Sequence, residues 1–210
     1  MDGDVPGFNS TENSKEGRTR VGESIRPFVD EAVRRLRIRL DDPRDGEAVD
    51  AVAVVTAVEP LGAILDRDAI CHGFAATLHA ELSRLTLRSG SPPLEQYPLL
   101  TQLIGDQCAR SVAVTAEAAT RFAHDRAEII RTLFDGVDPG RLTAIETTTA
   151  DAHQGGRRVA FLRFADYADP LVYKPRPVDS GALYSRLTGW LNQRLPDLGL
   201  ADVPMLIKSG

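Results

Sequence analysis

The stretch LTAIETTTADAHQGGRRVAFLRFADYADPLVYKPR, residues 142–176, decides the fold class of this chain. Residues 142–149 are rich in β-branched types, and short apolar runs follow at 159–164 (VAFLRF) and 171–173 (LVY). These patterns are typical of β-strands. A polar loop with two glycines, residues 150–158, separates the first two runs. We therefore expect three short strands that follow one another along the chain.

The sequence on either side of this stretch has helical periodicity. Apolar residues recur every three to four positions, with loop residues such as Pro, Gly and Asp between the segments. We expect helices over residues 24–40, 48–58 and 62–88, one or two helices over 94–134, and a last helix over 180–195. The third has a stripe that includes Leu82 and Leu85, and the last has Leu183, Leu187 and Trp190. Helices followed by strands predict an α+β fold, with a mainly helical region at 24–140, a sheet region at 141–210 and a disordered tail at 1–23.

Composition excludes several classes of protein. The 210 residues are 42% hydrophobic and carry a formal net charge of −5, so the chain is expected to fold and not to bind nucleic acid or anionic membranes. Two cysteines are too few for a disulfide scaffold. The polar N-terminus lacks the apolar core of a signal peptide, and no run of 18 apolar residues could span a membrane. We expect a cytoplasmic protein.

The loop at 150–158 and the strand after it concentrate the residues best suited to chemistry. Two glycines let the backbone approach a ligand, and the neighbouring arginines suit phosphate oxygens. Lys174 ends the third strand, and the chain has 22 Arg but only three Lys. A lysine at a strand end can place an ammonium on nucleotide phosphates, a task for which arginine is no equivalent. A plain turn, a surface histidine and a solvated lysine remain the alternatives for these residues.

A metal site is not expected. Cys71, His72 and His79 lie close together in sequence, but no third firm ligand or second Cys/His pair lies near them. Core or surface packing explains them better. The chain also lacks a Walker-A motif, a dinucleotide fingerprint and a nucleophile elbow.

Several of these residues together resemble a known family. The pattern combines Asp151-x-His153, Gly155-Gly156-Arg157-x-Val159, LVYKPR at 171–176 and WLN at 190–192. In this combination the chain resembles the dehydratase domain of class II lanthipeptide synthetases, which make lantibiotics, over roughly residues 25–208. One departure is Ala150, because the family usually has Gly immediately before the Asp.

The resemblance implies a lipid-kinase-like fold in which ATP and Mg²⁺ are used to phosphorylate Ser and Thr of a precursor peptide. Elimination of phosphate then leaves dehydroamino acids. On this chain, Lys174 would neutralise nucleotide phosphates, and Asp151 and His153 would assist phosphoryl transfer or elimination. The phosphate-binding residues implied by the resemblance are Gly155, Gly156, Arg157, Lys174 and, as a second cation, Arg176.

The resemblance also implies parts that the chain is expected to lack. The Mg²⁺-binding carboxylates of the kinase-like core and the zinc-containing cyclase domain would follow after residue 210. The chain is therefore expected to be the N-terminal part of a dehydratase and to be inactive alone. Its expected partner is a ribosomal precursor peptide, with a leader and a Ser/Thr/Cys-rich core. A second chain is one source of the missing lobe. The alternative is a helical interaction module that binds a peptide and whose kinase-like remnant no longer binds nucleotide.

Overall fold

A computed structural model describes residues 10–41, 61–88, 94–148, 157–175, 179–201 and 204–207 of the chain. Its helices are α1 (Ser10–Asp41), α2 (Leu61–Ile64), α3 (Arg67–Arg88), α4 (Pro98–Leu133) and α5 (Asp179–Arg194), with short 3₁₀ turns η1 (Leu94–Gln96) and η3 (Pro196–Leu198). The strands are β1 (Leu142–Thr147), β2 (Ala160–Phe164) and β3 (Leu171–Tyr173). The α+β class expected from the sequence is confirmed.

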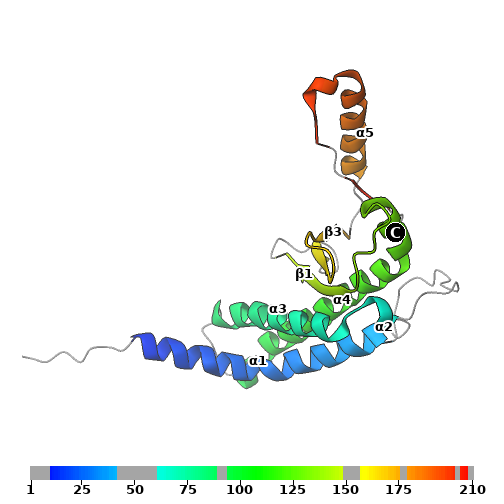
Figure 1. Cartoon of the computed structure of the whole chain (residues 1–210). Helices are drawn as coiled ribbons and strands as arrows, with labels where there is room; N and C mark the ends of the chain where they lie inside the picture. Colours follow the sequence, from blue (N-terminus) through cyan, green and yellow to red (C-terminus); the bar gives the residue numbers. More distant parts are fainter. Residues whose placement is uncertain are drawn as a thin grey trace, which may run out of the picture.

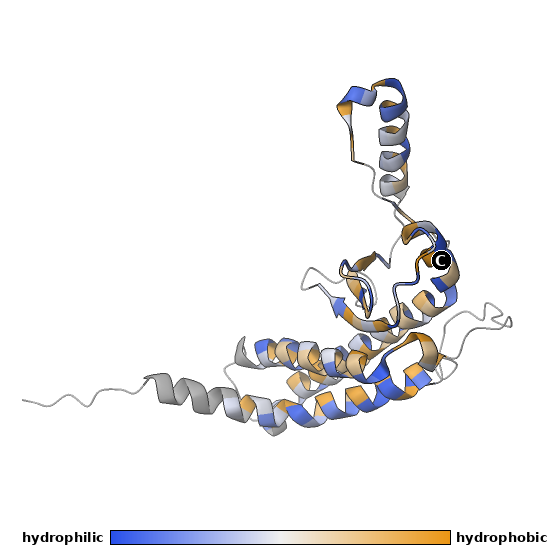
Figure 2. Cartoon of the chain, in the orientation of Figure 1, coloured by the Kyte–Doolittle hydropathy of each residue, from blue (hydrophilic) through white to orange (hydrophobic). Residues whose placement is uncertain are grey.

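The helices and the sheet form layers (Figure 1). Helix α1 packs along α3 and α4, and the sheet packs against the opposite side of these two helices, mainly through β1. Hydrophilic and hydrophobic residues alternate along the coloured part of α1, as in a helix with one apolar side (Figure 2). The hydrophobic core joins α1, α3, α4 and the inner face of the sheet in one cluster.

The sheet is antiparallel with the order β1-β2-β3. Along β2, Ala160, Leu162 and Phe164 are buried while the residues between them are more exposed, which is the period-two pattern of a strand with one face on a core. Phe164 contacts the Phe122 ring of α4 at 5.3 Å and the Phe134 ring at 5.5 Å between centroids. These aromatic contacts join the end of β2 to α4.

Two helices differ from their expected limits. Helix α1 begins at Ser10 rather than near residue 24, so residues 10–23 are helical and the expected disordered tail is wrong over that part. Val21, only 4% exposed, extends the buried side of α1 one turn before Ile25. Residues 1–9 and the helix expected at 48–58 lie outside the described residues.

The helix expected at 62–88 is interrupted at Asp66. The Asp66 backbone N–H donates to the Leu142 carbonyl of β1 at 2.8 Å, which takes this residue out of the helix. The Asp66 carboxylate accepts from the Ala69 N–H at 3.1 Å and so caps the start of α3. A contact with a strand 76 positions later in the chain therefore divides the helix, and local periodicity does not contain that information.

Acid is expected to weaken the fold at this cap. The Ala69 N–H and the Arg141 guanidinium hold the pKa of Asp66 below its ordinary value of 3.8. Because the folded pKa is depressed, the stability that this carboxylate contributes is present above pH 3.8 and is lost as the pH falls through the folded pKa. Asp66→Asn keeps an acceptor for Ala69 but removes the charge, so it should cost about 0.5 to 1 kcal/mol at pH 7 and progressively less as the pH falls below 3.8. Urea unfolding at pH 7 and at a series of pH values below 3.8 measures this, with the exposed Asp106→Asn on α4 as control; a cost that does not change with pH would contradict the assignment.

Gly140 is expected to tolerate no side chain. Its φ is +82°, and a Cβ there would collide with the Asp166 carboxylate. Gly140→Ala should therefore destabilise the chain by about 1 to 3 kcal/mol. Gly105→Ala is the control, because Gly105 lies inside α4 with open space around its Cα, and alanine there should stabilise by about 0.5 to 1 kcal/mol. Chemical denaturation of both variants measures the change in the free energy of unfolding. Equal changes in the two variants would contradict the prediction.

No helix in the described ranges is both long enough and apolar enough to cross a bilayer.

Candidate functional site

The ends of all three strands meet at one edge of the sheet. Thr147 of β1 lies opposite Ala160 of β2, and Ala160 lies opposite Tyr173 of β3. Just beyond, the Thr148 N–H donates to the Val159 carbonyl at 3.0 Å. Lys174 therefore follows β3 at the same edge from which the chain leaves after Thr148 and to which it returns at Arg157. We call this edge, with Arg157, Arg158, Tyr173 and Lys174, the strand-end site.

The Lys174 side chain is exposed at this site. Within the described ranges, no hydrogen bond or ion pair occupies its ammonium. This sets it apart from the arginines around it, which are paired with carboxylates. Lys174 thus offers a positive charge that an anionic ligand could take up without breaking an internal contact.

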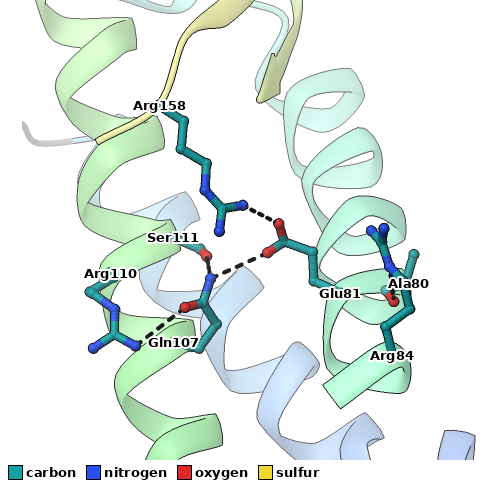
Figure 3. Close-up of polar contacts among 7 residues, drawn as sticks. All are labelled: Ala80, Glu81, Arg84, Gln107, Arg110, Ser111 and Arg158. Atoms are coloured by element: carbon teal, nitrogen blue, oxygen red, sulfur yellow. Dashed lines mark hydrogen bonds and ion pairs between the residues drawn. The ribbon is translucent and has the colours of Figure 1, made fainter. Parts of the chain in front are cut away.

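The two consecutive arginines form ion pairs with different helices. Arg157 Nε donates to Glu117 Oε2 of α4 at 3.1 Å. Arg158 Nη1 donates to Glu81 of α3, in an ion pair whose side chains are only 22% and 15% exposed (Figure 3). Residues 157 and 158 point to opposite sides, as successive residues of an extended chain do. The chain is therefore held by both helices where it enters β2.

Glu117 also connects the site to a further cation. Its Oε1 lies 3.0 Å from Arg121 Nη2, one turn along α4. The strand-end site with its helix partners thus gathers four cations, Arg121, Arg157, Arg158 and Lys174, against two carboxylates, Glu81 and Glu117. The excess of positive charge favours an anion. Because both carboxylates are engaged by arginines, they are poorly suited to hold a metal ion.

Tyr173 forms the buried side of this site. Burial raises the pKa of its hydroxyl, with the charges of Arg121, Glu117 and Arg157 as smaller influences. The hydroxyl oxygen is buried near Arg121 but makes no hydrogen bond of good geometry within the described part of the chain. Tyr173 is therefore neutral at pH 7. As the last residue of β3 it packs against α4, which fixes the position from which Lys174 extends.

The structure describes only some of the expected site residues. Arg157 and Lys174 lie at the same edge of the sheet, as described above. Asp151, His153, Gly155 and Gly156 lie outside the described residues, and so does Arg176. Their expected roles stay predictions.

Sequence reasoning did not find Glu81 and Glu117 as partners of this site. Glu117 and Arg121 stand four residues apart on a helix, a spacing that predicts no more than a solvated ion pair. Glu81 is separated from Arg158 by 77 positions. Only the packing of α3 and α4 under the sheet brings these carboxylates to the two arginines.

Of the three residues considered as metal ligands, Cys71 lies apart from the two histidines. Cys71 is 2% exposed and belongs to the core, where burial raises the pKa of its thiol. His72 and His79 are exposed and line a groove between α3 and α1. The described residues thus do not bring Cys71 together with these two imidazoles.

Comparison with protein families identifies the family of this region. A family model described as "Domain of unknown function (DUF4135)" matches residues 97–210, which is more than half of the chain. The matched region contains α4, the whole sheet and α5, and therefore the strand-end site. No curated protein matches the chain.

Proposed function

The chain belongs to the DUF4135 family, and from the strand-end site we propose that it is the nucleotide-binding part of an ATP-dependent dehydratase of the class II lanthipeptide synthetase type. The observation that carries this proposal is the exposed Lys174 ammonium, which pairs with no described residue, at the sheet edge bordered by Arg157 and Arg158. In the sequence, the D-x-H and GGR motifs that resemble the synthetases stand between β1 and β2, and the YKPR motif begins at the last residue of β3.

The residues of the site suit a nucleotide triphosphate. Lys174 supplies a compact, exposed positive charge that suits phosphate oxygens. Arg157 and Arg121 share Glu117, so part of their charge also remains available at the site. ATP with Mg²⁺ would supply the phosphoryl group. The carboxylates that hold Mg²⁺ are not among Glu81 and Glu117, because arginines already occupy both.

In the proposed reaction the hydroxyl oxygen of a peptide Ser or Thr takes the γ-phosphoryl group, and ADP and a proton are released. Removal of the α-proton with departure of phosphate then leaves a carbon–carbon double bond. Lys174 would stabilise the negative charge on the phosphates during transfer. Asp151 and His153 are proposed to move the protons, as their residue types allow.

A second function is favoured by a separate observation. On α5, Leu183 is 67% exposed, Leu187 51% and Trp190 48%, so this helix presents a row of apolar side chains to solvent. Helix α5 packs against η3 and projects from the rest of the molecule (Figure 1). An exposed apolar row of this kind favours an interaction module, in which α5 contacts a partner and the strand-end site binds no nucleotide.

Titration of the purified chain with Mg-ATP separates the two functions. The proposed function predicts saturable binding that is competed by ADP and weakened by salt, because phosphate contacts carry it. A chain that is well folded by circular dichroism but binds no nucleotide would instead favour the interaction module.

A further inference from the structure

A cavity of about 260 Å³ lies beside the strand-end site, on the side to which Arg158 points. Helices α3 and α4 both pack along α1 but touch each other little, and the end of β1 covers the gap between them. Four apolar side chains contribute to its wall: Phe74, Leu78, Val114 and Ile145. The remaining lining is polar and comes from α3, α4, the end of β1 and the segment before β2; it includes Glu81, Gln107, Arg110, Ser111 and Arg158.

The polar lining is a connected network (Figure 3). Glu81 accepts from Arg158 Nη1 and from Gln107 Nε2, the latter at 3.3 Å. Gln107 Nε2 also donates to Ser111 Oγ at 3.3 Å, and Arg110 Nη2 donates to Gln107 Oε1 at 3.2 Å. The bonds made by Gln107 are all long for hydrogen bonds. The Gln107 amide can therefore exchange these partners for a ligand at small cost.

The network has more donors than acceptors. Two guanidinium groups, Arg110 and Arg158, face the lining's single carboxylate, Glu81, which leaves one positive charge in excess. Arg158 Nε is buried and has no acceptor within the described part of the chain. A buried donor without an acceptor costs free energy, so a ligand that brings an acceptor would be stabilised here.

The size and the apolar wall limit what that ligand can be. Sites for whole small molecules usually exceed about 300 Å³, so this cavity is too small for a nucleotide. Inorganic phosphate would use the donors but leave the apolar wall without a contact. A glutamate side chain meets both demands, because its methylene groups suit the wall and its carboxylate suits the arginines.

We propose that this cavity binds one acidic side chain of a peptide. The inference rests on the proposed function in taking a peptide as the partner, but it concerns a neighbouring cavity that shares only Arg158 with the strand-end site. Arg110, exposed at the cavity, and Arg158, within it, would hold the carboxylate. A peptide bound in this way would lie next to the strand-end site, where its hydroxyl groups can reach a nucleotide.

The probe is N-acetyl-L-glutamate N-methylamide, titrated into the full chain labelled with ¹⁵N-arginine. The Nε–Hε resonance of Arg158, assigned with Arg158→Lys, should shift and saturate. Arg110→Gln should weaken this binding about tenfold, because it removes one charge-assisted contact. Arg84→Gln is the matched control: Arg84 lies on α3, donates to the Ala80 carbonyl at 3.3 Å and does not line the cavity, so binding should be unchanged.

Further probes separate the possible sources of a carboxylate or anion. The glutamine analogue of the probe should bind at least about tenfold more weakly, since it lacks the charge. Equal binding of both analogues, or no saturable shift with either, would overturn the proposal. Tighter binding of free L-glutamate would indicate a metabolite site, and binding of inorganic phosphate alone a simple anion site; either result would also overturn it.

Lys174→Ala distinguishes this inference from the proposed function. The variant should keep the glutamate response of Arg158 and lose Mg-ATP binding, because Lys174 does not line the cavity. If the wild-type chain binds the probe but no nucleotide, the proposed function fails and the acidic-side-chain pocket stands. If it binds nucleotide but not the probe, the acidic-side-chain pocket fails and the proposed function stands.

Discussion

Replacing Lys174 with alanine is expected to lower the affinity for Mg-ATP by at least about tenfold, which is the loss of one charge-assisted phosphate contact. The variant should fold normally, because the Lys174 side chain is exposed and its ammonium pairs with nothing in the described ranges. Isothermal titration of the wild-type and variant chains measures the change, and circular dichroism checks the fold.

Two further variants show whether position or charge is responsible. Lys15→Ala removes the same charge within α1 and should leave nucleotide affinity unchanged. Lys174→Arg keeps the charge but replaces a compact ammonium with a planar fork, and should recover only part of the affinity. Equal weakening by Lys15→Ala and Lys174→Ala would show that net charge alone matters, which contradicts a specific role for Lys174.

Replacing Leu82 with alanine is expected to destabilise the chain by about 3 kcal/mol. Leu82 is 0% exposed and lies in the core shared by α1, α3, α4 and the sheet. Truncation there removes buried methyl groups and leaves a cavity between packed helices, and both effects destabilise the fold. Urea unfolding followed by circular dichroism measures the difference in free energy.

The matched control lies one turn further along the same helix. Leu85 is 42% exposed, so Leu85→Ala should cost less than about 1 kcal/mol. Both substitutions change the same residue type in α3 and alter helix propensity equally, so the difference reports burial alone. If both variants lost similar stability, the packing of α3 against α1 described here would be wrong.

Leu82 and Leu85 also show that an apolar stripe predicts a helix but not the burial of each residue in it. Both belong to the apolar stripe that predicts the helix at 62–88, yet the fold buries one and exposes the other. On α5 the whole predicted stripe is exposed, because Leu183, Leu187 and Trp190 are all about half exposed or more. A stripe identifies a helix because its period is local, but whether another element covers the stripe depends on distant parts of the chain.

The strands were the most predictable elements. The runs at 142–149, 159–164 and 171–173 correspond closely to β1, β2 and β3. Short connections between them favour antiparallel neighbours, so the order β1-β2-β3 follows from the sequence as well. The break before α3 was not predictable, because the Asp66 backbone leaves the helix to bond with Leu142 of β1.

The sequence by itself determined the residue types of the strand-end site and their order along a strand–loop–strand. It singled out Lys174 through the scarcity of lysine and Arg157 through its place beside two glycines, since both features are local. Only the tertiary structure decided which carboxylates face the arginines and where the cavity lies. Glu81 meets Arg158, and Glu117 meets Arg157, because α3 and α4 both pack between α1 and the sheet. Ion pairs and cavities of this kind depend on how distant elements pack, and no pattern within a single helix or strand encodes that.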